Sequence, residues 1–391
     1  MMRPIPIVPM LALIALPLYV RAEDAPAFKQ AIEPRTLHFP DDHGSHAGYE
    51  TEWWYVTGNL TDASGHEFGY QFTLFRRAAD VKSAKERGRT SVWAPSDFYL
   101  GHLAISDVTA KQFSFEEDLL RGAAGLAGAT EAGANTKDPI KVWLREWNMT
   151  RTGNGWTLSA AQGDIALDLT LTETLQPVLH GRPGEEGLSH KGAKPGQASY
   201  YYSVPQLTTT GSLSIKKTAY AVTGKSWMDH EFGSNQLSAD QAGWEWFAIE
   251  LTDGSTLMLY QLRNRDGTLE PASSGTWIDA RGHSTHLPAA SFKTTPGRIW
   301  ISPKTQRKYA LDWHVEIPDR QIALDVRAAQ DDQEVRSLKT AGISYYEGAV
   351  HVSGTVAGKN ASGTGYLEIT GAPSATANGA TEKRDSLGGR L

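Results

Sequence analysis

The stretch WWYVTGNLTDASGHEFGYQFTLFRR, residues 53–77, predicts the fold class. Two runs rich in aromatic and β-branched residues flank a turn at Asp62-Ala63-Ser64-Gly65. Strand-forming residues on both sides of such a turn are typical of a β-hairpin. A related stretch, GWEWFAIELTDGSTLMLYQLRNR, occupies residues 243–265 and turns at Asp253-Gly254. The chain is therefore expected to be built from antiparallel strands.

The two hairpins resemble each other at three places, about 190 residues apart. The matching segments are Trp53-x-Tyr55 with Trp244-x-Trp246, Leu60-Thr61-Asp62 with Leu251-Thr252-Asp253, and Tyr70-Gln71-Phe72 with Tyr260-Gln261-Leu262. A repeat of this size indicates a duplicated β unit, although chance similarity between hairpins is the alternative. We predict one β domain over residues 27–205 and a second over 206–371, with the boundary at PQLTTTGSLSI (205–215).

The composition agrees with an all-β chain. The 391 residues include 38 Gly and 12 Trp, which favours many short strands and turns. The net charge is −6 and no basic run occurs, so nucleic acid is not expected as a partner. There is no cysteine, which excludes disulfides, thiol catalysis and cysteine-based metal sites. One helix is predicted, at residues 113–129; the choice between sandwich and barrel stays open at this level.

The two ends of the sequence are predicted to lie outside the β domains. Arg3, the apolar residues 5–20 and the small residue Ala22 after Val20-Arg21 are typical of an export signal, so residues 1–22 are predicted to be a signal peptide. A membrane anchor is the alternative, but prolines interrupt the run. A periplasmic or secreted protein, soluble after cleavage, is expected. Residues 372–391 are rich in Ala, Ser, Thr and Gly and are predicted to be a disordered tail.

The segment SWMDHEFGSNQ (226–236) places acidic and aromatic residues side by side. In a strand, Trp227, Asp229 and Glu231 would share one face and Met228, His230 and Phe232 the other. A carboxyl group against aromatic surface is desolvated, which raises its pKa, and a neutral carboxylic acid can act as a general acid. A surface strand with solvated carboxylates is the alternative.

Three other segments contain residues that could suggest a metal site or a hydrolase site. His38, Asp41, Asp42, His43, His46, Glu50 and Glu52 lie in one segment that could bind a metal, but a solvated polar loop is favoured because no known ligand spacing occurs. The two His-Glu-Phe-Gly copies lack the second His of a zinc peptidase helix. GLSHKG (187–192) departs from the Gly-x-Ser-x-Gly nucleophile motif. No metal and no cofactor are expected.

Several motifs, taken in order along the chain, resemble one known family. They are ETEWWYVTGNL (50–60), GLSHKG (187–192), YYYSVP (200–205), GKSWMDHEFGS (224–234), GWEWFAIEL (243–251) and GISYYEGAVHVSG (342–354). The chain is similar over residues 30–371 to the AttH/hydroxyneurosporene-synthase family, which includes carotenoid 1,2-hydratases and kievitone hydratases. The resemblance implies two consecutive lipocalin-like antiparallel β-barrel domains, a fold that can hold one small ligand.

The resemblance also implies a site and a chemistry. An aromatic-x-Asp pair implicated in the hydratases matches Trp227-x-Asp229, and their upstream His/Trp pair falls near Tyr200, Tyr201 and Tyr202. Asp229 would protonate an isoprenoid C=C bond, and Trp227, Tyr200 and Tyr202 would stabilise the cation. The expected ligand pocket comprises Glu52, Trp54, Glu231, Trp244, Trp246, Tyr260 and His190.

Two other functions stay open beside hydration of an apolar isoprenoid or lipid. The first is a non-catalytic lipid-binding carrier serving an envelope transporter. The second, weaker one is a hydrolase, for which the sequence shows no triad. The oligomeric state is not predicted.

Overall fold

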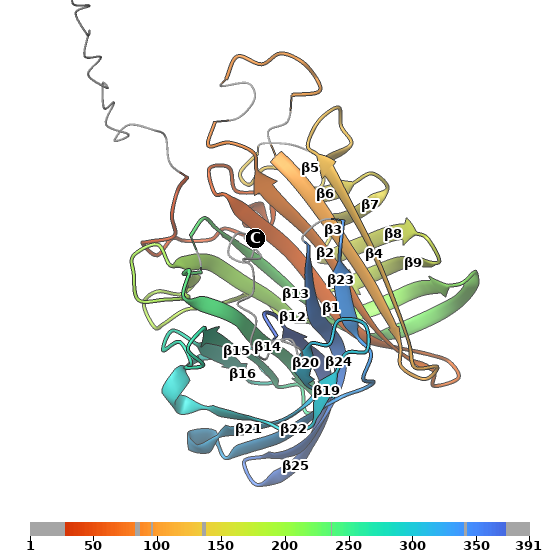
Figure 1. Cartoon of the computed structure of the whole chain (residues 1–391), viewed down its shortest axis with the longest axis vertical. Coiled ribbons are helices and arrows are strands. Elements are labelled where there is room, and N and C mark those ends of the chain that lie inside the picture. Colours follow the sequence, from red (N-terminus) through yellow and green to blue (C-terminus); the bar gives the residue numbers. More distant parts are fainter. Residues whose placement is uncertain are drawn as a thin grey trace, which may run out of the picture.

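The computed structural model describes residues 28–82, 87–94, 97–134, 138–235, 237–339 and 342–372. Within these residues the chain is all-β, as predicted, and folds into two consecutive lipocalin-like antiparallel units (Figure 1). The helical segments described are the short 3-10 turns η1 (Asp41–His43), η2 (Ala289–Ser291) and η3 (Pro318–Arg320). In the described part of the chain no helix is long and apolar enough to cross a membrane. The predicted signal peptide and residues 373–391 of the predicted tail lie outside the described residues.

The first sheet runs in the order β4-β3-β2-β1-β13-β12-β9-β8-β7-β6-β5, with β10 and β11 also paired to β12. It curls so that β3 and β4 contact β5 and β6 and nearly closes into a barrel. Its strands are β1 (Thr51–Asp62), β2 (Glu67–Ala78), β3 (Asp97–Asp107), β4 (Gln112–Arg121), β5 (Ala127–Ala129), β6 (Lys141–Leu144), β7 (Trp147–Thr152), β8 (Gly155–Gln162), β9 (Ile165–Thr172), β10 (Val178–Leu179), β11 (Leu188–His190), β12 (Ala198–Ile215) and β13 (Thr218–Gly233).

The second sheet runs in the order β17-β16-β15-β14-β25-β24-β22-β21-β18, with β23 paired to β24 and a separate pair β19-β20. Its strands are β14 (Gln241–Leu251), β15 (Thr256–Asn264), β16 (Ser274–Ile278), β17 (Ser284–Pro288), β18 (Lys293–Pro296), β21 (Asp312–Ile317), β22 (Ile322–Ala328), β23 (Glu334–Ser337), β24 (Ile343–Val356) and β25 (Lys359–Ile369). The separate pair is β19 (Ile299–Ile301) and β20 (Lys308–Ala310).

The predicted hairpins occupy equivalent places in the two sheets. β1 lies between β2 and β13, the last strand of its sheet, and β14 lies between β15 and β25, the last strand of the other. An aspartate side chain accepts a backbone hydrogen bond in both turns. Asp62 Oδ1 accepts from the Ser64 N–H at 2.8 Å, and Asp253 Oδ1 accepts from the Ser255 N–H at 2.9 Å. The common order of strands supports duplication of one unit.

The boundary predicted at 205/206 is wrong, because it falls inside β12. The first sheet continues to Gly233 through the β12–β13 hairpin, and the second begins at Gln241. Pro205 and Gln206 form a bulge, where the register to β13 shifts between Val204 and Leu207. The polar residues that suggested a linker are the exposed face of a strand, since burial alternates along residues 207–210.

The helix predicted at 113–129 is also wrong. Residues 112–121 form β4, which pairs along its length with β3, and residues 127–129 form β5. Pairing with β3 gives the backbone N–H and C=O groups of β4 the hydrogen bonds that a helix would form within itself. Gly122 and Gly125 lie between β4 and β5.

Three hydrophobic cores hold the molecule together. One fills the first barrel, around Trp54, Trp156 and Tyr202, and one lies in the second sheet, around Phe247, Trp313 and Tyr346. The third lies where the sheets meet and combines Tyr55, Tyr201 and Trp227 of the first with Trp246, Tyr260 and Tyr366 of the second. We call this third region the junction.

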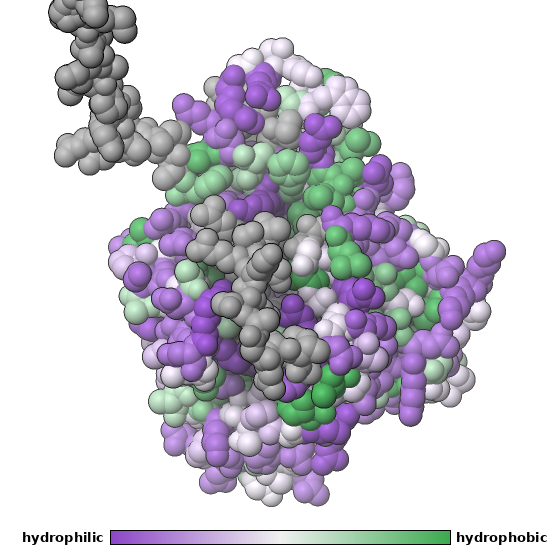
Figure 2. Space-filling model, in the orientation of Figure 1, coloured by the Kyte–Doolittle hydropathy of each residue, from purple (hydrophilic) through white to green (hydrophobic). Residues whose placement is uncertain are grey.

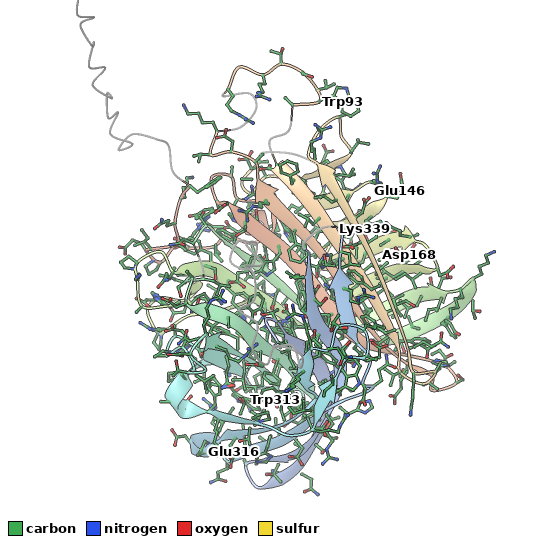
Figure 3. The ribbon with its side chains drawn as sticks, viewed as in Figure 1. Trp93, Glu146, Asp168, Trp313, Glu316 and Lys339 are labelled. Atoms are coloured by element: carbon green, nitrogen blue, oxygen red, sulfur yellow. The ribbon has the colours of Figure 1, made fainter. Side chains whose placement is uncertain are left out.

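The sheets also touch at their edges. The backbone N–H of Lys339, which follows β23, donates to Glu117 Oε1 of β4 at 2.8 Å. Figure 3 shows Lys339 beside the first sheet, Trp313 within the second, and Trp93 at the end of the molecule remote from Trp313. The face shown in Figure 2 carries mostly hydrophilic residues, with apolar residues scattered between them.

Candidate active site at the junction

Strand β13 presents two chemically different faces, as its alternation predicts. Trp227 belongs to the junction core, whereas Met228 and Phe232 belong to the core of the first barrel. Asp229 and Glu231 therefore face the second sheet, and His230 faces into the first barrel. The alternative of a solvated surface strand is wrong, because Asp229 is only 4% exposed.

Asp229 is held by three hydrogen-bond donors. Trp227 Nε1 donates to Oδ1 at 2.7 Å, Tyr201 Oη donates to Oδ2 at 2.6 Å, and Ser203 Oγ also donates to Oδ1. Burial raises the pKa of Asp229 to about 7, because desolvation disfavours the carboxylate; the three donors oppose this shift and the nearby Glu231 adds to it. Asp229 is thus a carboxyl group that exchanges a proton near neutral pH.

Aromatic rings of both sheets surround this carboxyl group. Trp246 Nε1 of β14 donates to Tyr201 Oη at 3.0 Å, which links the second sheet to Asp229. The Trp246 ring packs edge-on against Tyr55 and Trp227, with centroids 5.2 and 6.5 Å apart. Aromatic faces beside an acid can stabilise a positive charge that forms there.

Glu231, two residues along the same face, has a different environment. Lys191 Nζ lies 3.3 Å from Glu231 Oε1, and Ser199 Oγ donates to the same oxygen. Lys191 is buried, with its ammonium 4.9 Å from the ring centre of Tyr201 and 4.0 Å from that of Tyr260. Burial tends to lower the pKa of Lys191, but Glu231 and Tyr260 outweigh it and the pKa is raised. Lys191 therefore stays cationic and pairs with Glu231.

Two further acids approach from the second sheet. Glu347 of β24 and Glu368 of β25 are directly opposite each other in register; Glu347 is buried and Glu368 is half-buried. Burial, together with the repulsion between the two, raises the pKa of Glu347 well above its usual range, and burial raises that of Glu368 to about 8. Tyr55 Oη donates to Glu347 Oε1. The junction is thus acidic, with Lys191 as a buried cation.

A cleft of about 50 Å³ lies beside this region. Its lining includes Ser189, His190, Ser274, His286 and the exposed Arg182. Ser189 and Ser274 both lie within hydrogen-bond reach of Tyr260 Oη, at 3.0 and 2.9 Å. Lys191 Nζ donates to Ser189 Oγ at 3.1 Å, so a hydrogen-bonded chain connects the cleft with Glu231.

The same contacts disfavour a serine nucleophile of the kind that some hydrolases use. Ser189 lies beside Lys191 and Tyr260, an arrangement in which a neutral lysine could activate a serine. Here Glu231 holds Lys191 as a cation, and a cation accepts no proton. This geometry therefore does not support a serine nucleophile at position 189.

The structure places the predicted site residues in three regions. Trp227, Glu231, Trp246, Tyr260 and, partly buried, Trp244 lie at the junction with Asp229. His190 lies in the cleft and pairs with Glu185 at 3.0 Å. Glu52, Trp54, Tyr200 and Tyr202 instead lie inside the first barrel.

The placement of Tyr200 and Tyr202 corrects the sequence interpretation. β12 pairs with β13 so that Tyr202 opposes His230 and Ser203 opposes Asp229. Side chains directly opposite each other share a face, so Tyr201 and Ser203 accompany Asp229 and the other two tyrosines do not. The run of three tyrosines signalled the site, but only the register could select the middle one. Lys191 was marked only by its place beside His190 in the motif GLSHKG, and Ser203, Glu347 and Glu368 were not predicted as site residues.

The residues on the opposite face of β13 form a separate polar cluster, which we call the barrel network. Glu52 Oε1 contacts His46 Nδ1 at 2.7 Å and His230 Nε2 at 2.9 Å, while Arg76 Nε donates to Oε2 at 2.9 Å. His46 Nε2 lies 2.8 Å from Asp42 Oδ1. The segment around Asp42 and His46 is therefore buried, and the expectation that it is a solvated polar loop is wrong.

The barrel network includes the one group of described residues whose geometry could hold a metal ion, His46, Glu52 and His230, with ligand atoms within 4.8 Å of one another. These atoms already form hydrogen bonds to each other, and the Arg76 guanidinium occupies the second oxygen of Glu52. Burial raises the pKa of Glu52, but Arg76 and His46 outweigh it and hold the pKa well below its usual range. We interpret the group as a hydrogen-bonded ion cluster.

One prediction concerns pH and stability. Because the pKa of Asp229 is raised in the folded state, the stability that its protonated form contributes is lost as pH rises from about 4 to about 7. Asp229→Asn should therefore become more stable than the parent protein across this range, by about 2–4 kcal/mol at pH 8. Urea unfolding of both proteins at several pH values measures the difference in their free energies of unfolding. The other titrating groups are common to both proteins, so their contributions cancel. A difference that is independent of pH would contradict the raised pKa.

Comparisons with known proteins agree with this architecture. Residues 30–372 match the sequence profile of the AttH-like family. A crystal structure of an AttH protein from Nitrosomonas europaea superposes with a TM-score of 0.75 at 32% identity, covering 88% of this chain and 99% of that one. The kievitone hydratase structure from Nectria haematococca superposes with a TM-score of 0.64 at 15% identity, covering 88% and 98%, and so shares the fold.

Two curated relatives are similar in sequence over part of their length. "Dehydratase asqC" of Emericella nidulans is 23% identical over 221 residues, 54% of this chain and 60% of the relative. "Kievitone hydratase" of Fusarium solani subsp. phaseoli is 25% identical over 177 residues, 44% of this chain and 49% of the relative. The matches thus span about half of these relatives. The profile covers nearly all of the described residues, and the chain belongs to the AttH-like family.

Proposed function

We propose that this protein adds water to, or removes water from, a C=C bond of an apolar isoprenoid or lipid, without a cofactor and with Asp229 as the acid. The observation that carries the proposal is a carboxyl group with a pKa of about 7, buried between Trp227, Tyr201 and Trp246. Curated relatives named as a hydratase and a dehydratase support the reaction class.

In the hydration direction, Asp229 transfers its proton to the less substituted alkene carbon and becomes a carboxylate. The π bond supplies the electron pair for the new C–H bond, and the other carbon becomes a tertiary cation. Trp227, Tyr201 and Trp246 border this charge, and a cation that forms over the face of one of these rings is stabilised by cation–π attraction. Water adds to the cation and loses one proton, so the product is a tertiary alcohol. Dehydration follows the same steps in reverse.

Glu231 and Lys191 give the second half of the reaction a base. The ion pair lies on the same face of β13 as Asp229, so a carboxylate stands beside a neutral acid. Two carboxyl groups whose surroundings favour opposite charge states are the usual arrangement for acid and base roles. Glu231 accepts the proton that the added water loses. Substrate entry requires the packed rings of Tyr55, Trp227 and Trp246 to move apart.

The test is a search for the reaction in labelled water. The purified chain is incubated with a panel of isoprenoid alkenes and of the matching tertiary alcohols in H2(18)O, and the products are analysed by mass spectrometry. An enzyme should add one labelled water to an alkene or remove water from an alcohol, and the heat-denatured protein should do neither.

The same experiment also tests the alternative that the protein is a lipid carrier. An exported carrier that hands a lipid to an envelope transporter would copurify with an unmodified lipid and change no compound of the panel. That result would overturn the catalytic proposal for those compounds.

A further inference from the structure

A chain of three hydrogen-bonded polar side chains leads from the second sheet to Asp229. His180, which follows β10, is buried, with Nε2 2.6 Å from Ser203 Oγ and Nδ1 2.8 Å from Thr276 Oγ1 of β16. Ser203 Oγ in turn donates to Asp229 Oδ1. Each link is a hydrogen bond between groups that can both give and accept a proton.

We infer that Thr276, His180 and Ser203 form a proton relay to Asp229, in which His180 changes tautomer each time Asp229 gains or loses its proton. The inference rests on the proposed function, which requires Asp229 to be reprotonated after each hydration. His180 acts through Ser203 and touches no substrate, so it is a relay and positioning residue.

The directions of the bonds follow from the charge of Asp229. When Asp229 is a carboxylate, Ser203 donates to it, so His180 must donate from Nε2–H to Ser203 and accept at Nδ1 from Thr276. When Asp229 is protonated on Oδ1, it donates to Ser203, Ser203 donates to Nε2, and Nδ1–H donates to Thr276. The two states differ by one proton, which enters at Thr276 and arrives at Asp229.

The far end of the relay lies beside the cleft. Thr276 is directly opposite His286 of β17, so their side chains share a face. His286 lines the cleft, and its Nδ1 is buried without a hydrogen-bond partner among the described residues. The relay thus ends at Thr276 beside the cleft, where an entering water molecule can supply the proton.

The charges around the relay favour a neutral histidine, which tautomer exchange requires. Burial lowers the pKa of His180 well below its usual range, and Lys191 and His286 lower it further. On the Asp229 side, Tyr201 and Ser203 of β12 and Trp227 of β13 donate to the carboxyl group. Glu231, Lys191 and Glu368 interact with it electrostatically. His180 therefore passes a proton on without holding a charge.

The test is nitrogen-15 NMR of the full chain between pH 5.5 and 8.5, without any ligand. The His180 signals are identified by their loss in His180→Gln. At pH 8.5 the protonated nitrogen should be Nε2, at pH 5.5 it should be Nδ1, and the change should be centred where Asp229 titrates, about pH 7. His102, a second buried histidine whose pKa is lowered to about 4, should keep one tautomer throughout and serves as an internal control. A single His180 tautomer over the whole range overturns the relay.

Two variants show whether the link is direct. In Asp229→Asn the change of tautomer should disappear, because the titrating group is gone. In Ser203→Ala, Asp229 should still titrate, and the infrared carbonyl band of its protonated form measures that titration. The tautomer of His180 should no longer change with it. A His180 that still follows Asp229 without the Ser203 hydroxyl would exclude this path.

The failure of the relay and the failure of the proposed function are distinguishable. If Asp229→Asn stops turnover while parental His180 keeps one tautomer, the relay is wrong and the acid role stands. If His180 changes tautomer but Asp229→Asn turns over normally, the hydrogen-bonded chain exists and the proposed function is wrong.

Discussion

Asp229→Asn should reduce turnover in either direction by about 10²–10⁴-fold, the usual contribution of a positioned general acid. The amide has nearly the same shape as the carboxyl group but carries no transferable proton. Trp227 and Ser203 can still donate to its oxygen, and Tyr201 can rotate to accept from its nitrogen, so the junction should stay folded. The measurement is the rate of water addition or loss, by mass spectrometry, for a compound that the parental protein converts.

A matched control comes from the first sheet. Asp107 of β3 is also buried, at 5% exposed, but it pairs with His66 at 2.6 Å outside the junction. Asp107→Asn makes the same chemical change and should leave the turnover number unaltered. If Asp229→Asn kept the parental rate and pH profile, Asp229 would not be the acid, whatever the control did.

The pH profile adds an independent check of the same role. Hydration needs protonated Asp229, so the rate should fall as pH rises through about 7, roughly tenfold for each further pH unit. The reverse reaction begins with Asp229 as a carboxylate and Glu231 protonated, a state with the same number of protons, so its kcat/KM should fall with pH in the same way. A kcat/KM that does not change between about pH 6 and 9 in either direction would contradict the acid role of Asp229.

The second large effect is expected on stability, from Arg76→Met in the barrel network. Arg76 is 4% exposed, and it donates to Glu52 Oε2 and to the backbone carbonyls of His46 and Tyr49. Its removal leaves the carboxylate of Glu52 in an apolar core without the guanidinium cation that pairs with it. Breaking such a buried pair costs about 3–5 kcal/mol of folding free energy. Urea unfolding at pH 7 measures the loss in the free energy of unfolding.

Two further variants separate charge from packing. Arg145 pairs with Asp118 at 2.7 Å but is 53% exposed, so Arg145→Met should cost under about 1 kcal/mol. Adding Glu52→Gln to Arg76→Met removes the orphaned charge and should recover part of the loss. Equal losses for Arg76→Met with and without Glu52→Gln would mean that packing, and not the buried charge, accounts for the effect.

Local sequence was a good guide to the strands and to the faces of β13. The hairpins at 53–77 and 243–265 and the inward face of Trp227, Asp229 and Glu231 follow from alternation and turn residues, which act over a few positions. The predicted helix at 113–129 failed for the opposite reason. Its strand character comes from pairing with β3, a contact that local propensity does not contain.

The sequence by itself therefore determined the all-β class, the duplicated hairpin and the identity of Asp229 as the candidate acid. The tertiary structure alone decided what surrounds that acid. A one-residue change of register turns every side chain of a strand to the other face, so pairing to β13 chose Tyr201 over Tyr200 and Tyr202. Likewise Trp246 and Glu368 reach Asp229 or its hydrogen-bonded neighbours only because two sheets pack together. His180 and Lys191 follow β10 and β11, and they reach Ser203 and Glu231 because these short strands pair with β12, a long-range contact that no local pattern records.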